Sequence, residues 1–176
     1  MGERVSFSGR SLDLVQIAKH HECCYEALHE FFSTASPSFV NRYLGKSRSD
    51  LESELKFSLD ELDRSSAFNV LAAIEASLRT DYLTRVYGRK KGRLSRSFRK
   101  LYGSKKASAA LDRDILLAWV NDGGLPNRVY TALLKAFGYR HWLAHGRYWV
   151  PHQNYDYFSV SVIAQELFQV MDEAAS

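Results

Sequence analysis

Apolar residues recur at steps of three and four along most of the chain, the spacing of a helix with one buried face. Two long segments show this spacing most clearly, one from Ser11 to Phe31 and one from about Ser49 to Gly88. Within the second segment, Ser65–Ser66 predicts a bend, because serine hydroxyls compete locally for backbone hydrogen bonds. No competing run alternates apolar and polar residues with the period of a strand. The pattern therefore favours an all-α protein.

Shorter segments continue the helical pattern toward the C-terminus. Helices are predicted at 94–102 and 107–121, then from Pro126 through 145, and finally over Tyr157–Glu173. The segment 36–47 is rich in Ser, Pro and Gly and predicts a loop. We expect an antiparallel bundle of about five to six helices that forms a single domain over 1–176, with its core at about 11–175.

Composition limits the class of protein. The chain has 176 residues, of which 45% are hydrophobic and 13% aromatic, so a disordered chain is excluded. Its longest uninterrupted apolar run, 115–120, is far too short to cross a membrane, and the N-terminal segment lacks the apolar stretch of a secretory signal. A cytoplasmic protein without a membrane partner is the expectation.

The two cysteines, Cys23 and Cys24, are adjacent and do not suit a disulfide. His20 and His21 precede them, so a metal site is conceivable at this point. Packing on a helix face is the preferred interpretation, since free cysteine behaves as a small apolar residue.

Positive charge is concentrated in one segment. Residues 85–106 hold ten of the 24 Lys and Arg residues and no acid, whereas the rest of the chain has more acidic than basic residues. Such asymmetry draws a polyanion to one face of the protein. Tyr87, Phe98 and Tyr102 lie within the segment and suit stacking on unpaired bases, although the alternative of inward-packed rings on a solvated face stays open.

The segment Tyr139–Trp149 (YRHWLAHGRYW) places Arg140, His141 and His145 near a predicted helix end at Gly146. Three interpretations apply. His141 and His145 have the i, i+4 spacing of zinc ligands, but Trp142 stands where a zinc protease has its general-base glutamate, and no third ligand is evident.

The second interpretation is structural. His141 then belongs to the apolar stripe as a half-buried side chain, and His145 is a favourable cation at the helix C-terminus. The third is cleavage of RNA without metal. RNA supplies its own nucleophile, so a histidine that moves the proton and an arginine that stabilises phosphate charge suffice. On a straight helix, however, Arg140 and His145 point about 140° apart.

Arg140-His141-x-x-x-His145 resembles the Arg-polar-x(4–6)-His motif of the HEPN superfamily, an all-α bundle with this motif on a late helix, often followed by glycine. The same spacing recurs at Arg147 and His152, but Tyr148 and Pro151 depart from the motif. The resemblance implies a metal-independent endoribonuclease, frequently a toxin or antiviral effector, that needs no cofactor. It also implies a homodimer with a composite active site, and it leaves room for a cognate antitoxin.

Under this resemblance Arg140 stabilises the phosphate, His145 transfers the proton and His141 orients or polarises. Glu75, a lone acid in an apolar stretch of the long helix, is predicted to hold Arg140, although a routine helix pair with Arg79 explains it equally. The residues predicted to bind RNA are Arg89, Lys90, Lys91, Arg93, Arg96, Arg99 and Lys100. The alternative function is a non-catalytic HEPN-like module that binds RNA, a nucleotide or a protein partner.

Overall fold

The computed structural model describes residues 4–174, and every regular element in that range is helical. The α-helices are α1 (Leu14–Phe31), α2 (Phe39–Tyr43), α3 (Arg48–Tyr87), α4 (Arg93–Lys105), α5 (Leu117–Asp122), α6 (Asn127–Ala144) and α7 (Tyr157–Glu173). A 3₁₀ turn at Lys106–Ser108 and a π-helical segment at Leu111–Leu116 lead into α5. The all-α prediction is confirmed, with one helix more than expected. Residues 1–3 and 175–176 of the predicted domain lie outside the described range.

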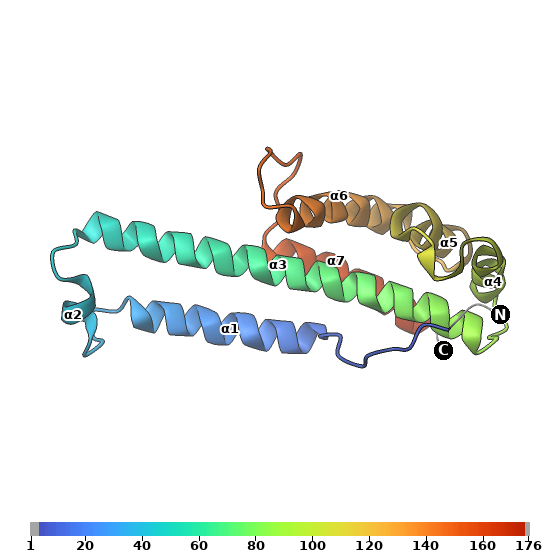
Figure 1. The fold of residues 1–176 in the computed structure, drawn as a ribbon, viewed down its shortest axis with the longest axis horizontal. Helices are drawn as coiled ribbons and strands as arrows, with labels where there is room; N and C mark the ends of the chain where they lie inside the picture. The colour runs from blue at the N-terminus through green and yellow to red at the C-terminus, as the bar shows by residue number, and fades with distance from the viewer. Residues whose placement is uncertain (1–3, 175–176) are drawn as a thin grey trace.

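Helix α3 is the spine of the molecule. It has 40 residues, so it is about 60 Å long. α1 runs antiparallel beside its first half, whereas α6 and α7 lie beside its second half and α4 and α5 gather near its C-terminal end (Figure 1). Ser47 caps α3 by accepting from the backbone N–H of Asp50, whose carboxylate accepts in turn from the N–H of Ser47. The helix therefore begins slightly before its predicted start, and Gly88 ends it as expected.

The bend predicted at Ser65–Ser66 does not interrupt α3, which is one continuous helix through both residues. Ser66 is buried, and its hydroxyl lies 2.9 Å from Nδ1 of His21 on α1. This contact between helices uses the hydroxyl that was expected to disturb the backbone. Ser65 instead donates to the carbonyl of Leu62, which α3 accommodates within its regular turn.

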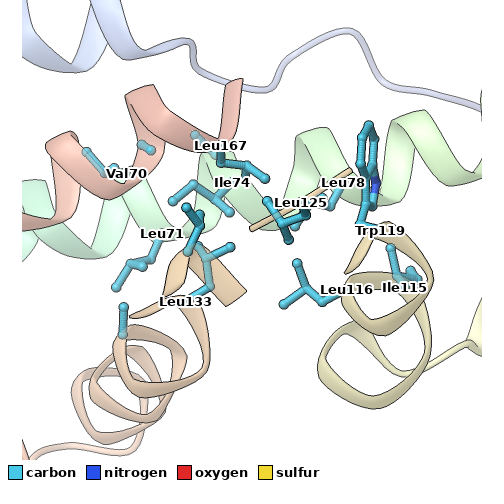
Figure 2. Packing of buried hydrophobic residues seen from close by; sticks show 14 of the residues in the cluster. Val70, Leu71, Ile74, Leu78, Ile115, Leu116, Trp119, Leu125, Leu133 and Leu167 are labelled. Carbon is cyan, nitrogen blue, oxygen red and sulfur yellow. The ribbon is translucent and has the colours of Figure 1, made fainter. Parts of the chain in front are cut away.

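The core forms around the second half of α3. Figure 2 shows Leu71, Ile74 and Leu78 of this helix meeting side chains from α5, α6 and α7. Trp119 of α5, Leu133 of α6 and Leu167 of α7 are fully buried there. Gly123 allows the end of α5 to pass over the Trp119 ring, because a Cβ at this position would lie 2.4 Å from that ring.

The predicted loop at 36–47 contains the extra helix α2. Its Tyr43 is buried and stacks on Phe32 at 5.5 Å between ring centroids, while Phe39 packs at 5.1 Å. Arg42 lies 3.9 Å from the centroid of the Phe31 ring. These contacts stabilise a five-residue helix that local sequence preference does not indicate, so the loop prediction was wrong here. Separately, none of the described helices is long and apolar enough to cross a membrane.

Candidate active site at the end of α6

The motif lies on the last turn of α6 and the residues that follow. His145 is the C-cap, and its backbone N–H donates to the carbonyl of His141 at 3.1 Å. Gly146 follows with a φ of +81°, and the N–H of Arg147 donates to the carbonyl of Trp142 at 3.1 Å. This is a Schellman termination, in which a left-handed residue lets the chain turn back on the helix. The predicted helix end at Gly146 is confirmed.

The two motif histidines contact each other at the surface. Their ring centroids are 4.2 Å apart, and both residues are exposed. The Trp149 ring lies 5.8 Å from that of His141. His141 is thus not the half-buried member of the apolar stripe that the structural interpretation expected, because the stripe's buried positions are Val129, Leu133, Ala136 and Tyr139, and His141 falls outside their arc.

The side chain of Arg140 points toward α3 and remains partly exposed to solvent. Its Nη1 lies 2.8 Å from Oε2 of Glu75, and its guanidinium carbon is 5.6 Å from the Phe68 ring centroid. The side chain keeps 32% of its area exposed, while its Nε is buried without a hydrogen-bond partner among the described residues. The predicted contact between Glu75 and Arg140 is therefore present, and its functional role stays a prediction.

Glu75 joins two arginines. Its second oxygen, Oε1, accepts from Nε of Arg79 at 2.8 Å, so both the helix pair and the reach to Arg140 exist together. Arg79 also donates to the carbonyl of Ala109 at 3.2 Å. One partly buried carboxylate between two guanidiniums is a strong positioning device, because charge-assisted hydrogen bonds fix both partners.

The motif residues form two pairs within one chain. Arg140 pairs with Glu75, and His141 pairs with His145. Within the described part of the chain, no hydrogen bond, ion pair or ring contact joins Arg140 to either histidine. Arg140 is directed to Glu75 on α3, whereas both histidines are exposed at the surface.

Sequence reasoning missed the groove beside Arg140. A groove of about 300 Å³ lies between α3 and the end of α6, and Phe68, Leu143 and Arg147 are among its lining residues. Nη1 of Arg147 bonds both carboxylate oxygens of Glu61, at 2.6 and 2.8 Å, and this hydrogen bonding lowers the pKa of Glu61. The two residues are 86 positions apart, and no local pattern in the sequence indicates the pair.

The second occurrence of the motif spacing has a different setting. Arg147 adopts a left-handed φ of 60° and is bound to Glu61, and His152 lies outside the helices in the loop that precedes α7. Both residues are thus separated from the regular helix on which the motif of the HEPN superfamily is expected. His152 serves below as a matched control.

The residues considered as possible metal ligands are dispersed. No group of three or more His, Cys, Asp or Glu side chains in residues 4–174 is arranged to hold a metal ion. In the HHECC segment, His20 lies near Cys24, with Nε2 3.7 Å from Sγ. His21 instead contacts Ser66 and stacks on Tyr157 at 4.2 Å between centroids, so the two histidines face different surroundings.

The basic segment lies at the C-terminal end of α3, whereas the motif lies beside its middle (Figure 1). Of the seven residues predicted to bind RNA, all but the half-buried Arg99 are exposed. Arg93 pairs with Asp122 at 2.5 Å, and Arg99 donates to the carbonyl of Lys90 at 2.6 Å. Gly88 follows Glu75 by thirteen positions along α3 and directly precedes Arg89, so the residues predicted to bind RNA begin about 20 Å from the Arg140 pair.

The aromatic residues of the basic segment pack inward. Phe98 is fully buried against Tyr82, at 5.0 Å between ring centroids. Tyr87 and Tyr102 meet edge to face at 5.8 Å. Base stacking on Phe98 is excluded by its burial, and the alternative of inward-packed rings describes this face.

Comparison of the chain with protein-family models, with curated proteins and with solved structures gives no match. The chemistry open to the site therefore follows from its own groups. A positioned guanidinium suits binding of an anionic oxygen, and exposed imidazoles suit proton transfer near neutral pH.

Proposed function

We propose that the protein is a metal-independent endoribonuclease whose site is built from Arg140, His141 and His145. The observation that carries the proposal is the combination at one helix end of two exposed, mutually contacting histidines with an arginine that a carboxylate holds in place. Core packing explains neither histidine, since both are exposed, and Arg140 keeps about one-third of its side chain exposed. The resemblance to the HEPN motif supports the same reaction.

The proposed reaction is transesterification within the RNA strand. The 2′-oxygen loses its proton and bonds to the adjacent phosphorus, while the bond from phosphorus to the 5′-oxygen breaks. His145 accepts the proton of the 2′-hydroxyl and donates a proton to the leaving 5′-oxygen, in a shared acid–base role, so the 5′-oxygen leaves as a hydroxyl. His141 orients or polarises the reacting groups. Arg140 stabilises the charge that develops on the phosphate oxygens. The products are a 2′,3′-cyclic phosphate and a 5′-hydroxyl end.

A second copy of the chain completes the site in this proposal. Arg140 is directed toward Glu75 on α3, whereas the histidine pair is directed to solvent from the same turn. An isologous pair of helix ends brings the arginine of one copy toward the histidines of the other, because two-fold symmetry duplicates every contact. A toxin or defence role with a cognate antitoxin follows from the family resemblance and belongs to the proposal.

The basic segment would bind the RNA backbone away from the cut. Six of its seven predicted RNA-binding residues are exposed, and phosphate contacts position a nucleic acid without reading its sequence. Since these residues begin about 20 Å along α3 from the partner of Arg140, only an RNA several nucleotides long reaches both sites. Short oligonucleotides are therefore expected to be poorer substrates than long ones.

The test is incubation of total RNA with wild type, His145→Ala and His152→Ala in EDTA, with mapping of fragment ends. We expect cyclic-phosphate ends from wild type and from His152→Ala, and at least a hundredfold slower cleavage by His145→Ala. His152 is the matched control because it lies in the loop that follows the motif. Equal cleavage by all three proteins, or cleavage that EDTA abolishes, would contradict the proposal.

The second candidate is a module that binds RNA, a nucleotide or a protein partner without cutting. The distance between the basic segment and the motif favours it, since a polyanion can occupy the segment without approaching Arg140. Salt-sensitive RNA binding by wild type and His145→Ala alike, without cleavage by either, would select this function.

A further inference from the structure

A cleft of about 740 Å³ lies among the described residues, and the proposed chemistry does not use it. It is walled by α1, α3, α6 and the loop before α7. His21 lies on its α1 side, Asp60 and Asp63 on its α3 side, and Trp142 on its α6 side. Its volume is in the range of small-molecule sites. Asp63 precedes Glu75 by twelve residues on α3, so the cleft lies about 18 Å from the partner of Arg140.

An unpartnered polar group faces this cleft. Tyr139 is only 3% exposed, and its hydroxyl forms no hydrogen bond with any described residue. Burial raises the pKa of Tyr139, and the nearest charged groups include Arg64 and Asp63, which line the same cleft. The ring of Tyr139 is enclosed, but its hydroxyl oxygen is not buried, so a ligand that enters the cleft can form a hydrogen bond with it.

The charged lining of the cleft is mostly acidic. Asp60 has no hydrogen-bond or ion-pair partner in the described chain. Asp63 and Asp156 each have one oxygen occupied, by the N–H of Tyr157 at 3.0 Å and of Ser159 at 2.6 Å. Among the described lining residues Arg64 is the single arginine or lysine, and its Nη1 already bonds Glu61 at 2.5 Å. Several carboxylate oxygens thus remain available to a donor.

Aromatic rings complete the lining. Tyr25, Trp142 and Tyr155 border the cleft, and the rings of Tyr139 and Trp142 stack at 5.4 Å between centroids. Aromatic faces attract cations, and a planar guanidinium combines stacking with bidentate hydrogen bonds to a carboxylate. An anion such as a phosphate meets three carboxylates here and is disfavoured.

We propose that this cleft binds a guanidinium group, held by Asp60 and Asp63 against the Tyr139 hydroxyl and the rings of Tyr155 and Trp142. The group is carried either by a small free molecule or by an arginine side chain of a peptide. The site does not depend on the proposed RNase chemistry, because its polar groups are separate from Arg140, His141 and His145.

The experiment is calorimetric titration of the whole chain with agmatine, with the capped peptide Gly-Arg-Gly and with neutral n-butylurea. We expect agmatine to bind with a dissociation constant below about 1 mM and butylurea at least tenfold more weakly. Asp60→Asn and Asp63→Asn each weaken agmatine binding roughly tenfold, and Tyr139→Phe weakens it roughly threefold. Asp112→Asn, an exposed change on the π-helical segment, leaves it within twofold.

Comparison of agmatine with Gly-Arg-Gly identifies which kind of molecule carries the guanidinium group. Tighter binding of Gly-Arg-Gly than of agmatine assigns the cleft to a protein segment, whereas the reverse assigns it to a free small molecule. Equal affinity for butylurea, or wild-type affinity in both aspartate variants, would overturn the proposal, as would the absence of binding up to about 10 mM. If a variant does not fold, the comparison of agmatine with butylurea on the wild-type protein still tests the proposal. Agmatine should shift the indole N–H resonance of Trp142 and leave that of buried Trp119 unchanged.

Discussion

The two halves of α3 carry the same kind of apolar repeat in very different surroundings. In the first half, Leu51, Leu55, Leu59 and Leu62 recur with helical spacing, yet none of them is buried. Every buried residue of α3 lies from Ser66 onward. The difference arises because α1 is the main helix beside the first half, where the end of α6 and the loop after it reach only the last residues, whereas α4 to α7 gather around the second half (Figure 1).

Charged pairs show the same contrast. Arg48 and Glu52 near the start of α3 pair at 2.8 Å with side chains 92% and 65% exposed. Glu75 and Arg79 have the same four-residue separation and the same distance, but Glu75 is only 21% exposed and also binds Arg140. Identical local geometry gives a solvated surface pair in one half and a positioned network in the other, because neighbouring helices control access of water.

The largest expected effect is the difference in unfolding free energy between two leucine truncations, one in each half of α3. Leu78→Ala removes a fully buried side chain and should lower the free energy of unfolding by about 3 kcal/mol, whereas Leu55→Ala should lower it by about 1 kcal/mol. Urea denaturation at low protein concentration measures both. Equal losses would mean that the first half is also enclosed, and a loss for Leu55→Ala that grows with protein concentration would identify a second copy as the cover.

A smaller effect compares the two charged pairs. Glu75→Ala leaves Arg79 and Arg140 without their carboxylate and should cost about 1–2 kcal/mol, since both guanidiniums are partly buried. Glu52→Ala is the matched control and should change stability by less than about 0.5 kcal/mol. Thermal and urea unfolding of both variants provide the measurement. A change at Glu75 no larger than that at Glu52 would show that Arg140 needs no carboxylate to hold it.

The smallest effect is a difference in pH dependence. Burial raises the pKa of Asp81 above its ordinary value of 3.8, whereas hydrogen bonds from Ser47 lower the pKa of Asp50 below it. Asp81 therefore contributes stability below pH 3.8 that is lost as pH rises through its higher folded value. Asp50 contributes stability above pH 3.8 that is lost as pH falls through its lower folded value.

Asparagine variants test these opposite signs. Asp81→Asn should make the slope of stability against pH more positive just above pH 3.8, and Asp50→Asn should make it less positive just below that pH. Urea midpoints measured between pH 2.5 and 6 give both slopes. Slope changes of the same sign would contradict the assignment of Asp81 to a buried half and Asp50 to a solvated half.

The sequence by itself determined the helical class, most helix positions and the helix ends. α7 matches its predicted bounds, and Gly88 and Gly146 end helices where expected. These features depend on apolar spacing and on a few capping residues, which act within four or five positions of one another. The contact between Glu75 and Arg140 could also be predicted from the sequence, because a lone carboxylate in an apolar stretch needs a partner.

Only the tertiary structure decided which apolar faces are covered and which polar groups meet. The stability of α2, the exposure of His141, the burial of Phe98 and the pairing of Glu61 with Arg147 depend on helices that are distant in the sequence. The same holds for the cleft around Tyr139, whose walls come from three helices and a loop. Periodicity specifies that a face is apolar, but burial is a property of the whole packed chain, so its extent is fixed only when the helices assemble.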